Sequence, residues 1–350
     1  MEMKMKALVK YGNNPNQLEI RDVPVPKIDA DDVLLEVKAA GICGWDIEMW
    51  QHKMATSFNV SIIQGHEFCG VIKEIGKNIK DFKIGERVVS ETAAVICGKC
   101  TQCLTGNYHL CPGRKGFGYG VDGAFADYVK VPGRCLHRIP EGVSFDHAAL
   151  TEPACVAYQA IVVLSKIQAG KAVLIIGPGP IGLFSVQVAA ACGAYPIMVA
   201  GTDKDIARLE KAKQLGSDFV INVSLENAVE FVKDQTGGEG VPLVVDAAGN
   251  EKSLRMALDA VSSGGQITKI GWGPKPVNFS LDTLLSKAAR LQGTFSHNWP
   301  TWQAVLAMMS RGLIKIEPMI SHRIALDKWE ETFKLIEECH ATKAIILFNR

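Results

Sequence analysis

Four cysteines lie within fifteen residues of this chain, in the segment CGKCTQCLTGNYHLC. Cys97, Cys100, Cys103 and Cys111 follow the spacing C-x2-C-x2-C-x7-C, with turn residues in and beside it. Zn²⁺ binds four thiolates in a tetrahedron, and such a site leaves no position for water or substrate. The spacing therefore predicts a structural zinc that holds a loop and does no chemistry. An iron–sulfur cluster or free thiols are the alternatives.

Three other segments carry side chains that a catalytic zinc uses. GICGWD contains Cys43, GHEFCG contains His66 and Glu67, and LTEPACVA contains Glu152. One thiolate, one imidazole and a carboxylate leave a coordination position open. An alcohol bound there becomes a stronger acid, and the alkoxide that forms when it loses its proton can release hydride. Each residue also has a structural interpretation: a small core cysteine, a hydrogen-bonded histidine or solvated carboxylates. Because the segments are distant in sequence, spacing alone leaves both interpretations open.

A glycine-rich loop follows an apolar run in VLIIGPGPIGL. Gly177, Gly179 and Gly182 give G-x-G-x-x-G, with Pro180 and Ile181 between the last two glycines. The loop leaves a predicted strand and opens a predicted helix, which is the context of a dinucleotide-binding turn. Glycines let the backbone approach a pyrophosphate, and the helix N-terminus offers free N–H groups to it. An ordinary tight turn between strand and helix is the alternative.

The elements around these residues change character near Glu152. Before it, short strands such as Val33–Gly41, Cys69–Gly76 and Gly85–Ser90 predict a compact, mostly β domain. After it, apolar runs alternate with helical stretches, which predicts a parallel sheet covered on both faces. The predicted fold class is therefore α/β, a mostly β domain plus a doubly wound parallel sheet. Beyond about Ser296 the pattern is irregular and ends in KAIILFNR, a plausible strand that returns to the first domain.

The composition argues against nucleic-acid binding and against a membrane protein. The chain has 350 residues, is 47% hydrophobic and has a net charge of +1, so it can bury two cores and has no basic stripe for nucleic acid. Loops interrupt the apolar stretch 172–200, which argues against a membrane span. The start MEMKMKALVKYG has no apolar signal core, so we expect a cytoplasmic protein whose ten cysteines are reduced or bind metal.

Together, these segments resemble the zinc-dependent medium-chain alcohol dehydrogenases, most of all the polyol (sorbitol, xylitol) and threonine branch. The resemblance also includes GFGYGVDGAFADYV and covers essentially the whole chain. It implies a GroES-like catalytic domain over 1–154 with a zinc lobe at 90–115, a Rossmann domain over 155–295, and a return to the catalytic domain over 296–350. It further implies two zinc ions per chain, NAD or NADP, and a homo-oligomer, either tetramer or dimer.

The resemblance also assigns roles to individual residues. Cys43 and His66 match ligands of the catalytic zinc, Glu67 matches a carboxylate that binds it directly or through water, and Glu152 matches the carboxylate typical of the polyol and threonine branch. Asp46 matches the acid that orients the histidine. The Glu-Pro pair followed by ACVAYQA favours a polyol over threonine.

Two positions depart from the family pattern near the ligand cysteine. Trp45 stands where the family usually has the Ser or Thr that relays the alcohol proton, and Glu48 stands in place of a histidine. We hypothesise that a water with Glu67 or Glu152, or Glu48 itself, takes the proton. Trp45 forms either an apolar wall of the substrate pocket or simple core packing.

The cofactor segment departs as well. Gly201 occupies the usual place of the acid that binds the adenosine ribose, and Asp203 or Asp205 could substitute for it. Alternatively, Gly201, Thr202 and Lys204 could accept a 2′-phosphate. We favour NAD because two carboxylates would repel that phosphate. The resemblance assigns further cofactor contacts to Thr202, Asp203, Arg208, Ile270, Gly271, Trp272, Thr294, Phe295 and Ser296. His297 either reaches the substrate or lies at the surface.

The function predicted from the sequence is oxidation of a secondary alcohol on a small polyol, sugar alcohol or cyclitol to a ketone, with zinc and NAD(P). An amino-alcohol substrate such as threonine is the nearest alternative. A non-catalytic sensor that binds zinc and nucleotide is the alternative from another class, although a sensor needs no vacant coordination position. We expect no nucleic-acid partner and no membrane association.

Overall fold

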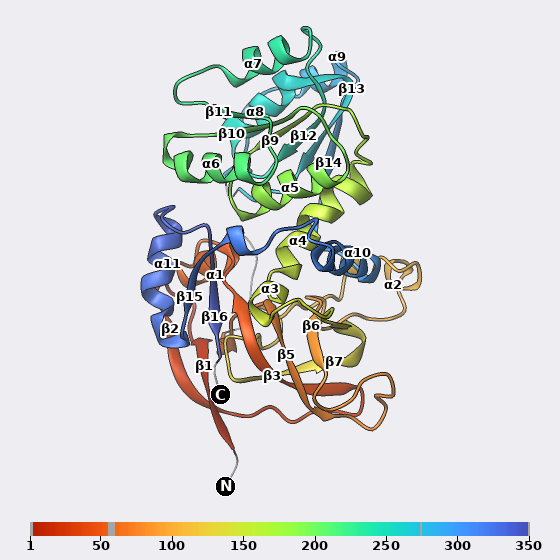
Figure 1. The fold of residues 1–350 in the computed structure, drawn as a ribbon. Coiled ribbons are helices and arrows are strands. Elements are labelled where there is room, and N and C mark those ends of the chain that lie inside the picture. The colour runs from red at the N-terminus through yellow and green to blue at the C-terminus, as the bar shows by residue number, and fades with distance from the viewer. Residues whose placement is uncertain (1–2, 55–59, 274, 349–350) are drawn as a thin grey trace. The chain divides into compact units, whose positions relative to one another are not determined.

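The computed structural model describes residues 3–54, 60–273 and 275–348. The chain divides into two compact units (Figure 1). Residues 1–152, 296–310 and 320–350 form the first unit, and residues 153–295 and 311–319 form the second. The domain limits at 154 and 295 that the resemblance implies stay a prediction. Each unit is described by itself.

The first unit is mostly β, as its short strands predict. A seven-stranded sheet has the order β15-β16-β3-β5-β6-β8, with β7 also paired to β3, and a smaller sheet has the order β2-β1-β4. The C-terminal strand β16 pairs antiparallel with β3, so the end of the chain completes this sheet. The strands are β1 (Lys4–Lys10), β2 (Leu18–Pro24), β3 (Asp32–Gly41), β4 (Ile62–Ile63), β5 (Glu67–Ile75), β6 (Arg87–Ser90), β7 (Tyr128–Pro132), β8 (Leu136–Arg138), β15 (Ile320–Ile324) and β16 (Lys343–Leu347).

The central strand β3 has an almost continuous apolar sequence, DVLLEVKAAG, because strands pair with it on both edges and the core covers it. Leu35, Val37 and Phe68 are among the buried residues of that core. Short helices and turns connect the strands. They are α1 (Gly44–Trp50), α2 (Thr101–Leu104), η1 (Tyr108–Leu110), η2 (Gly133–Cys135), α3 (Phe145–Ala148), α10 (Trp299–Ser310), η6 (Leu326–Lys328) and α11 (Trp329–Glu337).

The second unit is a six-stranded parallel sheet with the order β11-β10-β9-β12-β13-β14. In chain order this is 3-2-1-4-5-6, the order of a doubly wound dinucleotide-binding fold, and the direction of winding reverses between β9 and β12. Ligands of such sheets bind beyond the carboxyl ends of the strands at that point. The strands are β9 (Val173–Ile176), β10 (Ile197–Gly201), β11 (Phe219–Asn222), β12 (Val241–Asp246), β13 (Val261–Lys269) and β14 (Arg290–Gly293).

Helices cover this parallel sheet, with α5 and α6 on one side and α7 and α8 on the other (Figure 1). Strand β9, VLII, is buried at every position, as expected for a parallel strand covered on both faces. The remaining elements of the unit are the end of α4 (Thr151–Tyr158), the π-helical turn η3 (Gln159–Leu164), α5 (Pro180–Ala191), η4 (Asp203–Asp205), α6 (Ile206–Gln214), α7 (Ala228–Gln235), α8 (Glu251–Ala260), α9 (Asp282–Ser286) and η5 (Glu317–Met319).

One helical run, Phe145–Leu164, is long and apolar enough to cross a membrane by length and composition, within the ranges that the structure describes. Its most apolar window is 67% buried inside the protein, which is typical of a core helix.

Candidate active site and metal centres

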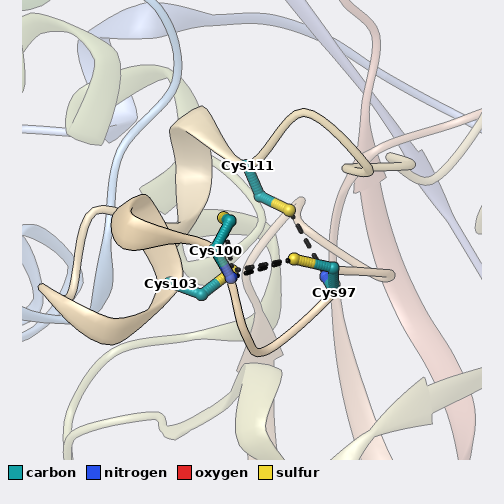
Figure 2. A group of neighbouring side chains, drawn as sticks. All are labelled: Cys97, Cys100, Cys103 and Cys111. Carbon is teal, nitrogen blue, oxygen red and sulfur yellow. Dashed lines mark hydrogen bonds between the residues drawn. The ribbon is translucent and has the colours of Figure 1, made fainter.

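The four clustered cysteines meet in one loop (Figure 2). Each offers a sulfur, and all four sulfurs lie within 4.8 Å of one another. The Cys100 and Cys103 sulfurs are 3.5 Å apart, and the Cys97 backbone N–H donates to the Cys111 sulfur at 3.3 Å. Backbone N–H groups of Lys99 and Cys100 lower the pKa of the Cys97 thiol to about 6, which favours the thiolate that metals bind. The donor set fits a closed tetrahedral zinc site.

A second cluster brings together Cys43, His66 and Glu67, whose ligand atoms also lie within 4.8 Å of one another. Cys43 is the N-cap residue of α1, and His66 directly precedes β5, whose first residue is Glu67. The two turns that follow β3 and precede β5 therefore meet, because these strands are antiparallel neighbours and Gly41 lies opposite Glu67. This pairing explains how segments distant in sequence converge.

The surroundings of His66 favour a positive charge. Burial alone would lower the pKa of His66, but Asp46 and Cys43 raise it well above its usual value. Asp46 is buried, accepts a hydrogen bond from the Cys43 backbone N–H at 2.9 Å, and has its second oxygen 3.7 Å from His66 Nδ1. Neither that oxygen nor Nδ1 has a hydrogen-bond partner within the described residues. The arrangement fits a histidine that binds a cation and is oriented by Asp46.

Glu67 forms a buried ion pair that the sequence did not predict. Lys343 Nζ, at the start of β16, lies 2.6 Å from Glu67 Oε1 and also donates to the Ile42 carbonyl at 2.8 Å. Burial raises the pKa of the Glu67 carboxyl, whereas Lys343 acts to lower it. The second oxygen, Oε2, is buried without a hydrogen-bond partner in the described chain, and a Cβ on Gly41 would lie 2.1 Å from it. Glu67 belongs to the cluster with Cys43 and His66, so a metal ion bound there could take this unpartnered oxygen as a ligand.

Glu152, at the start of α4, lies outside the group of three ligand atoms. His297 Nε2 lies 3.0 Å from Glu152 Oε1, and the Trp302 indole N–H donates to His297 Nδ1 at 2.7 Å. Burial would raise the pKa of Glu152, but the hydrogen bond from His297 and the charges of His66 and Lys343 lower it. His297 is 1% exposed, so the interpretation of it as a surface residue is wrong. Glu152 is near enough to act on the cluster electrostatically.

Trp45 and Glu48, the two residues near Cys43 that depart from the family pattern, lie on α1. The Trp45 ring makes an edge-to-face contact with Tyr119, with centroids 5.8 Å apart. Glu48 is partly buried, and burial raises its pKa. Neither side chain belongs to the cluster of ligand atoms. The proton route and the role of Trp45 stay predictions.

The glycine loop of the second unit has the geometry that its motif predicts. Gly177 has a φ of +96°, and a Cβ on Gly182 would lie 1.9 Å from the Gly177 carbonyl oxygen. Gly179 is the N-cap of α5 and has open space where a Cβ would stand. Pro180 and Ile181 open the helix, so its first N–H groups are directed beyond β9, at the point where the winding of the sheet reverses. This is the place where a pyrophosphate binds in such folds.

The end of β10 is organised around Asp205. Its Oδ2 accepts hydrogen bonds from the Thr202 N–H at 2.9 Å and the Thr202 hydroxyl at 2.8 Å, and its Oδ1 pairs with Arg208. A Cβ on Gly201 would lie 3.1 Å from the Asp205 Cβ, so Asp205 stands beside the strand end. Asp203 instead accepts a hydrogen bond from the Ser224 hydroxyl at 3.2 Å.

Of the other predicted cofactor residues, all but Ser296 lie in the second unit. Ile270 and Gly271 follow β13, and both N–H groups donate to the Asp246 carbonyl at 2.9 Å. Trp272 and Phe295 stack edge to face with centroids 6.4 Å apart, while the Thr294 N–H donates to the Lys269 carbonyl at 3.2 Å. Ser296 belongs to the first unit, where Arg114 donates to its hydroxyl at 3.3 Å.

Two protein families match this chain, one in each half of the sequence. Residues 29–141 match the family described as alcohol dehydrogenase GroES-like domain, and residues 180–311 match the family described as zinc-binding dehydrogenase. A sorbitol dehydrogenase of Halalkalibacterium halodurans is 33% identical over 98% of this chain and 99% of its own. An L-threonine 3-dehydrogenase of Bacillus licheniformis is 35% identical over 99% of this chain and 100% of its own.

A solved structure of a zinc-binding dehydrogenase from Sinorhizobium meliloti 1021, bound to NADP, has a TM-score of 0.91 to this chain. It is 28% identical and covers 99% of this chain and 100% of its own. Two relatives are more than 30% identical to this chain over nearly their full length, and both family domains occur in order. These two observations establish the family. The chain belongs to the zinc-type medium-chain alcohol dehydrogenases, with a GroES-like and a Rossmann-type domain, and is a dehydrogenase.

Proposed function

We propose that this dehydrogenase oxidises a secondary alcohol of a small polyol, sugar alcohol or cyclitol to a ketone, reversibly, with NAD as hydride acceptor. The observation that carries the proposal is the cluster of Cys43, His66 and Glu67 with its unsatisfied carboxylate oxygen. A zinc ion held there would supply a Lewis acid that makes the alcohol a stronger acid. The closed lobe of Cys97, Cys100, Cys103 and Cys111 would hold a second, structural zinc.

Different residues of this chain would bind the metal and orient its ligands. Cys43 and His66 would bind the metal. Asp46, whose Oδ1 lies 3.7 Å from His66 Nδ1, would keep the imidazole ring in its orientation. Lys343 holds one oxygen of Glu67 and leaves the other without a hydrogen-bond partner in the described residues. Glu152 would act beside these ligands as a further carboxylate, with a coordination position left for the alcohol. Polyols suit such a site because two adjacent hydroxyls can reach one cation.

A second candidate function is oxidation of an amino alcohol such as threonine, because a threonine dehydrogenase is as similar to this chain as a sorbitol dehydrogenase is. The zinc-loaded enzyme should be assayed by NADH absorbance with sorbitol, xylitol, inositols and threonine. We expect turnover with at least one polyol. Turnover with threonine alone would favour the second candidate and contradict the first.

We propose NAD rather than NADP because Asp205 stands beside the end of β10 and neutralises Arg208. A 2′-phosphate placed there would meet a carboxylate and a cation that is already paired. We expect kcat/KM to favour NAD by at least about tenfold, which corresponds to ~1.4 kcal/mol. Asp205→Asn should reduce that preference. A wild-type preference for NADP would contradict this assignment.

We also propose a homo-oligomer, either a dimer or a tetramer, located in the cytoplasm. Strand β14 is an edge of the parallel sheet, Leu291 on it is 40% exposed, and nearby Leu285 is 80% exposed. Unpaired edges with apolar side chains favour pairing with another chain. All ten cysteines are free of disulfides, which suits a reducing compartment. Light scattering on the purified enzyme tests the oligomer, and cell fractionation tests the location.

A further inference from the structure

Helix α10 supplies hydrogen-bond donors to two buried histidines, each of which contacts a buried glutamate. Trp302 donates to His297, which lies 3.0 Å from Glu152. One residue further along, the Gln303 amide donates to His137 Nδ1 at 2.6 Å, and His137 Nε2 lies 2.9 Å from Glu91. The two triads share one design, but only the first reaches a residue of the proposed active site.

The indole N–H of Trp302 is a donor only, so it fixes the tautomer of His297. Because Nδ1 accepts this bond at 2.7 Å, the ring hydrogen must lie on Nε2, and Nε2 donates to Glu152 Oε1. His297 is thus a neutral donor aimed at one carboxylate oxygen. Trp302 is fully buried and also contacts the His297 ring edge to face, with centroids 5.2 Å apart, so the ring has little freedom to turn.

The hydrogen bond from His297 holds one of the two carboxylate oxygens of Glu152. Glu152 is 8% exposed, and the His297 ring hydrogen-bonds to its Oε1 at 3.0 Å. A carboxylate that accepts a fixed N–H on one oxygen keeps its second oxygen in a fixed direction. Partners of this kind orient carboxylates and histidines at metal sites, and their loss typically weakens metal binding by about 10–100-fold.

We propose that His297, held in its Nε2–H tautomer by Trp302, is a positioning residue that orients Glu152 at the catalytic zinc. The proposal deepens the proposed function and rests on it. It assigns His297 no contact with the substrate and no part in the hydride step. The effect of His297 must therefore appear first in metal binding and in the geometry around the metal.

The test uses the full-length enzyme with cobalt exchanged into the open site while the cysteine lobe keeps its zinc. His297→Leu removes the donor, and His297→Gln offers an amide N–H in its place. Trp302→Phe keeps an aromatic ring but frees the tautomer. Gln303→Leu is the matched control, because it removes the equivalent donor from the His137 and Glu91 triad on the same helix.

We expect His297→Leu to weaken cobalt and zinc binding at the open site by about 10–100-fold and to change the visible cobalt spectrum. Trp302→Phe should show a smaller change of the same kind, and His297→Gln should restore most of the affinity. Gln303→Leu should lower the thermal midpoint and leave the spectrum and affinity as in the wild type.

Two results would overturn the inference. In the first, His297→Leu and Trp302→Phe keep the wild-type affinity and spectrum. In the second, Gln303→Leu changes them as much as the His297 variants do, which would indicate a general loss of packing. If His297→Leu does not fold, the comparison of Trp302→Phe with Gln303→Leu decides alone. A wild-type enzyme that binds only one zinc per chain would instead contradict the proposed function itself.

Discussion

The two carboxylates of the proposed metal site have different partners, and this difference gives them different properties. Glu67 is paired with the ammonium of Lys343, and Glu152 accepts a hydrogen bond from the neutral His297. Removing the charged partner of a buried charge costs about 3–5 kcal/mol, whereas removing a hydrogen bond from a neutral donor to a charged group costs about 1.5–3 kcal/mol. We therefore expect changes at Lys343 to affect stability most and changes at His297 to affect metal geometry most.

Lys343→Met should destabilise the folded protein by about 3–5 kcal/mol, because it leaves the Glu67 carboxylate buried without its partner. Denaturant unfolding of the metal-free protein measures this, because a bound cation would also compensate the Glu67 charge. The double variant Lys343→Met with Glu67→Gln should recover most of the loss, since no unpaired charge remains. A single variant that is as stable as the wild type would show that Glu67 does not need Lys343.

At the scale of the elements, local geometry determines the dinucleotide loop and the cysteine lobe. The loop needs only β9, a tight turn and the first turn of α5, and all three are adjacent in sequence. The lobe lies between Cys97 and Cys111 and closes on itself. Substitutions in either element should therefore have separable effects on folding and on binding.

Gly182→Ala should destabilise the second unit, because its Cβ would lie 1.9 Å from the Gly177 carbonyl oxygen and would force α5 away from the loop. Gly179→Ala has open space for its Cβ, so it should keep wild-type stability and weaken NADH binding by blocking the approach of the pyrophosphate. Thermal unfolding and NADH fluorescence titration distinguish the two. Wild-type stability in Gly182→Ala would contradict the close approach.

Cys100→Ser should remove one zinc per chain and lower the thermal midpoint, while the open site keeps its metal. The lobe also supports α10, because the Tyr108 hydroxyl accepts a hydrogen bond from the Trp299 N–H at 2.7 Å. Metal analysis with calorimetry measures both effects, and Ser217→Ala in the second unit serves as a control substitution outside the lobe. Loss of both zinc ions from Cys100→Ser would contradict two independent sites.

At the scale of the whole molecule, the first unit is assembled from three separate stretches of chain, and its site draws on all of them. Cys43, His66 and Glu67 come from the first stretch, His297 from the second and Lys343 from the third. The pairing of β16 with β3 brings Lys343 beside Glu67. Loss of the last stretch would therefore open both the sheet and the site.

This assembly explains which parts of the molecule could be predicted from its sequence. The parallel sheet, the glycine loop and the cysteine lobe depend on neighbouring residues, and their patterns predicted them. Lys343 stands in an apolar strand and His297 precedes an irregular stretch, so neither carries a local signal of its partner. Their roles depend on contacts 276 and 145 residues away in sequence, which only the folded chain reveals.

The central claim is that the protein has a metal site open to substrate in addition to the closed cysteine lobe. Zinc analysis of the purified wild type and of Cys43→Ser, together with polyol-dependent NADH formation, tests it most directly. We predict two zinc ions per chain and turnover in the wild type, and one zinc ion without turnover in Cys43→Ser. A wild type with a single zinc held by Cys97, Cys100, Cys103 and Cys111, or a Cys43→Ser variant that keeps both ions and full turnover, would contradict the account.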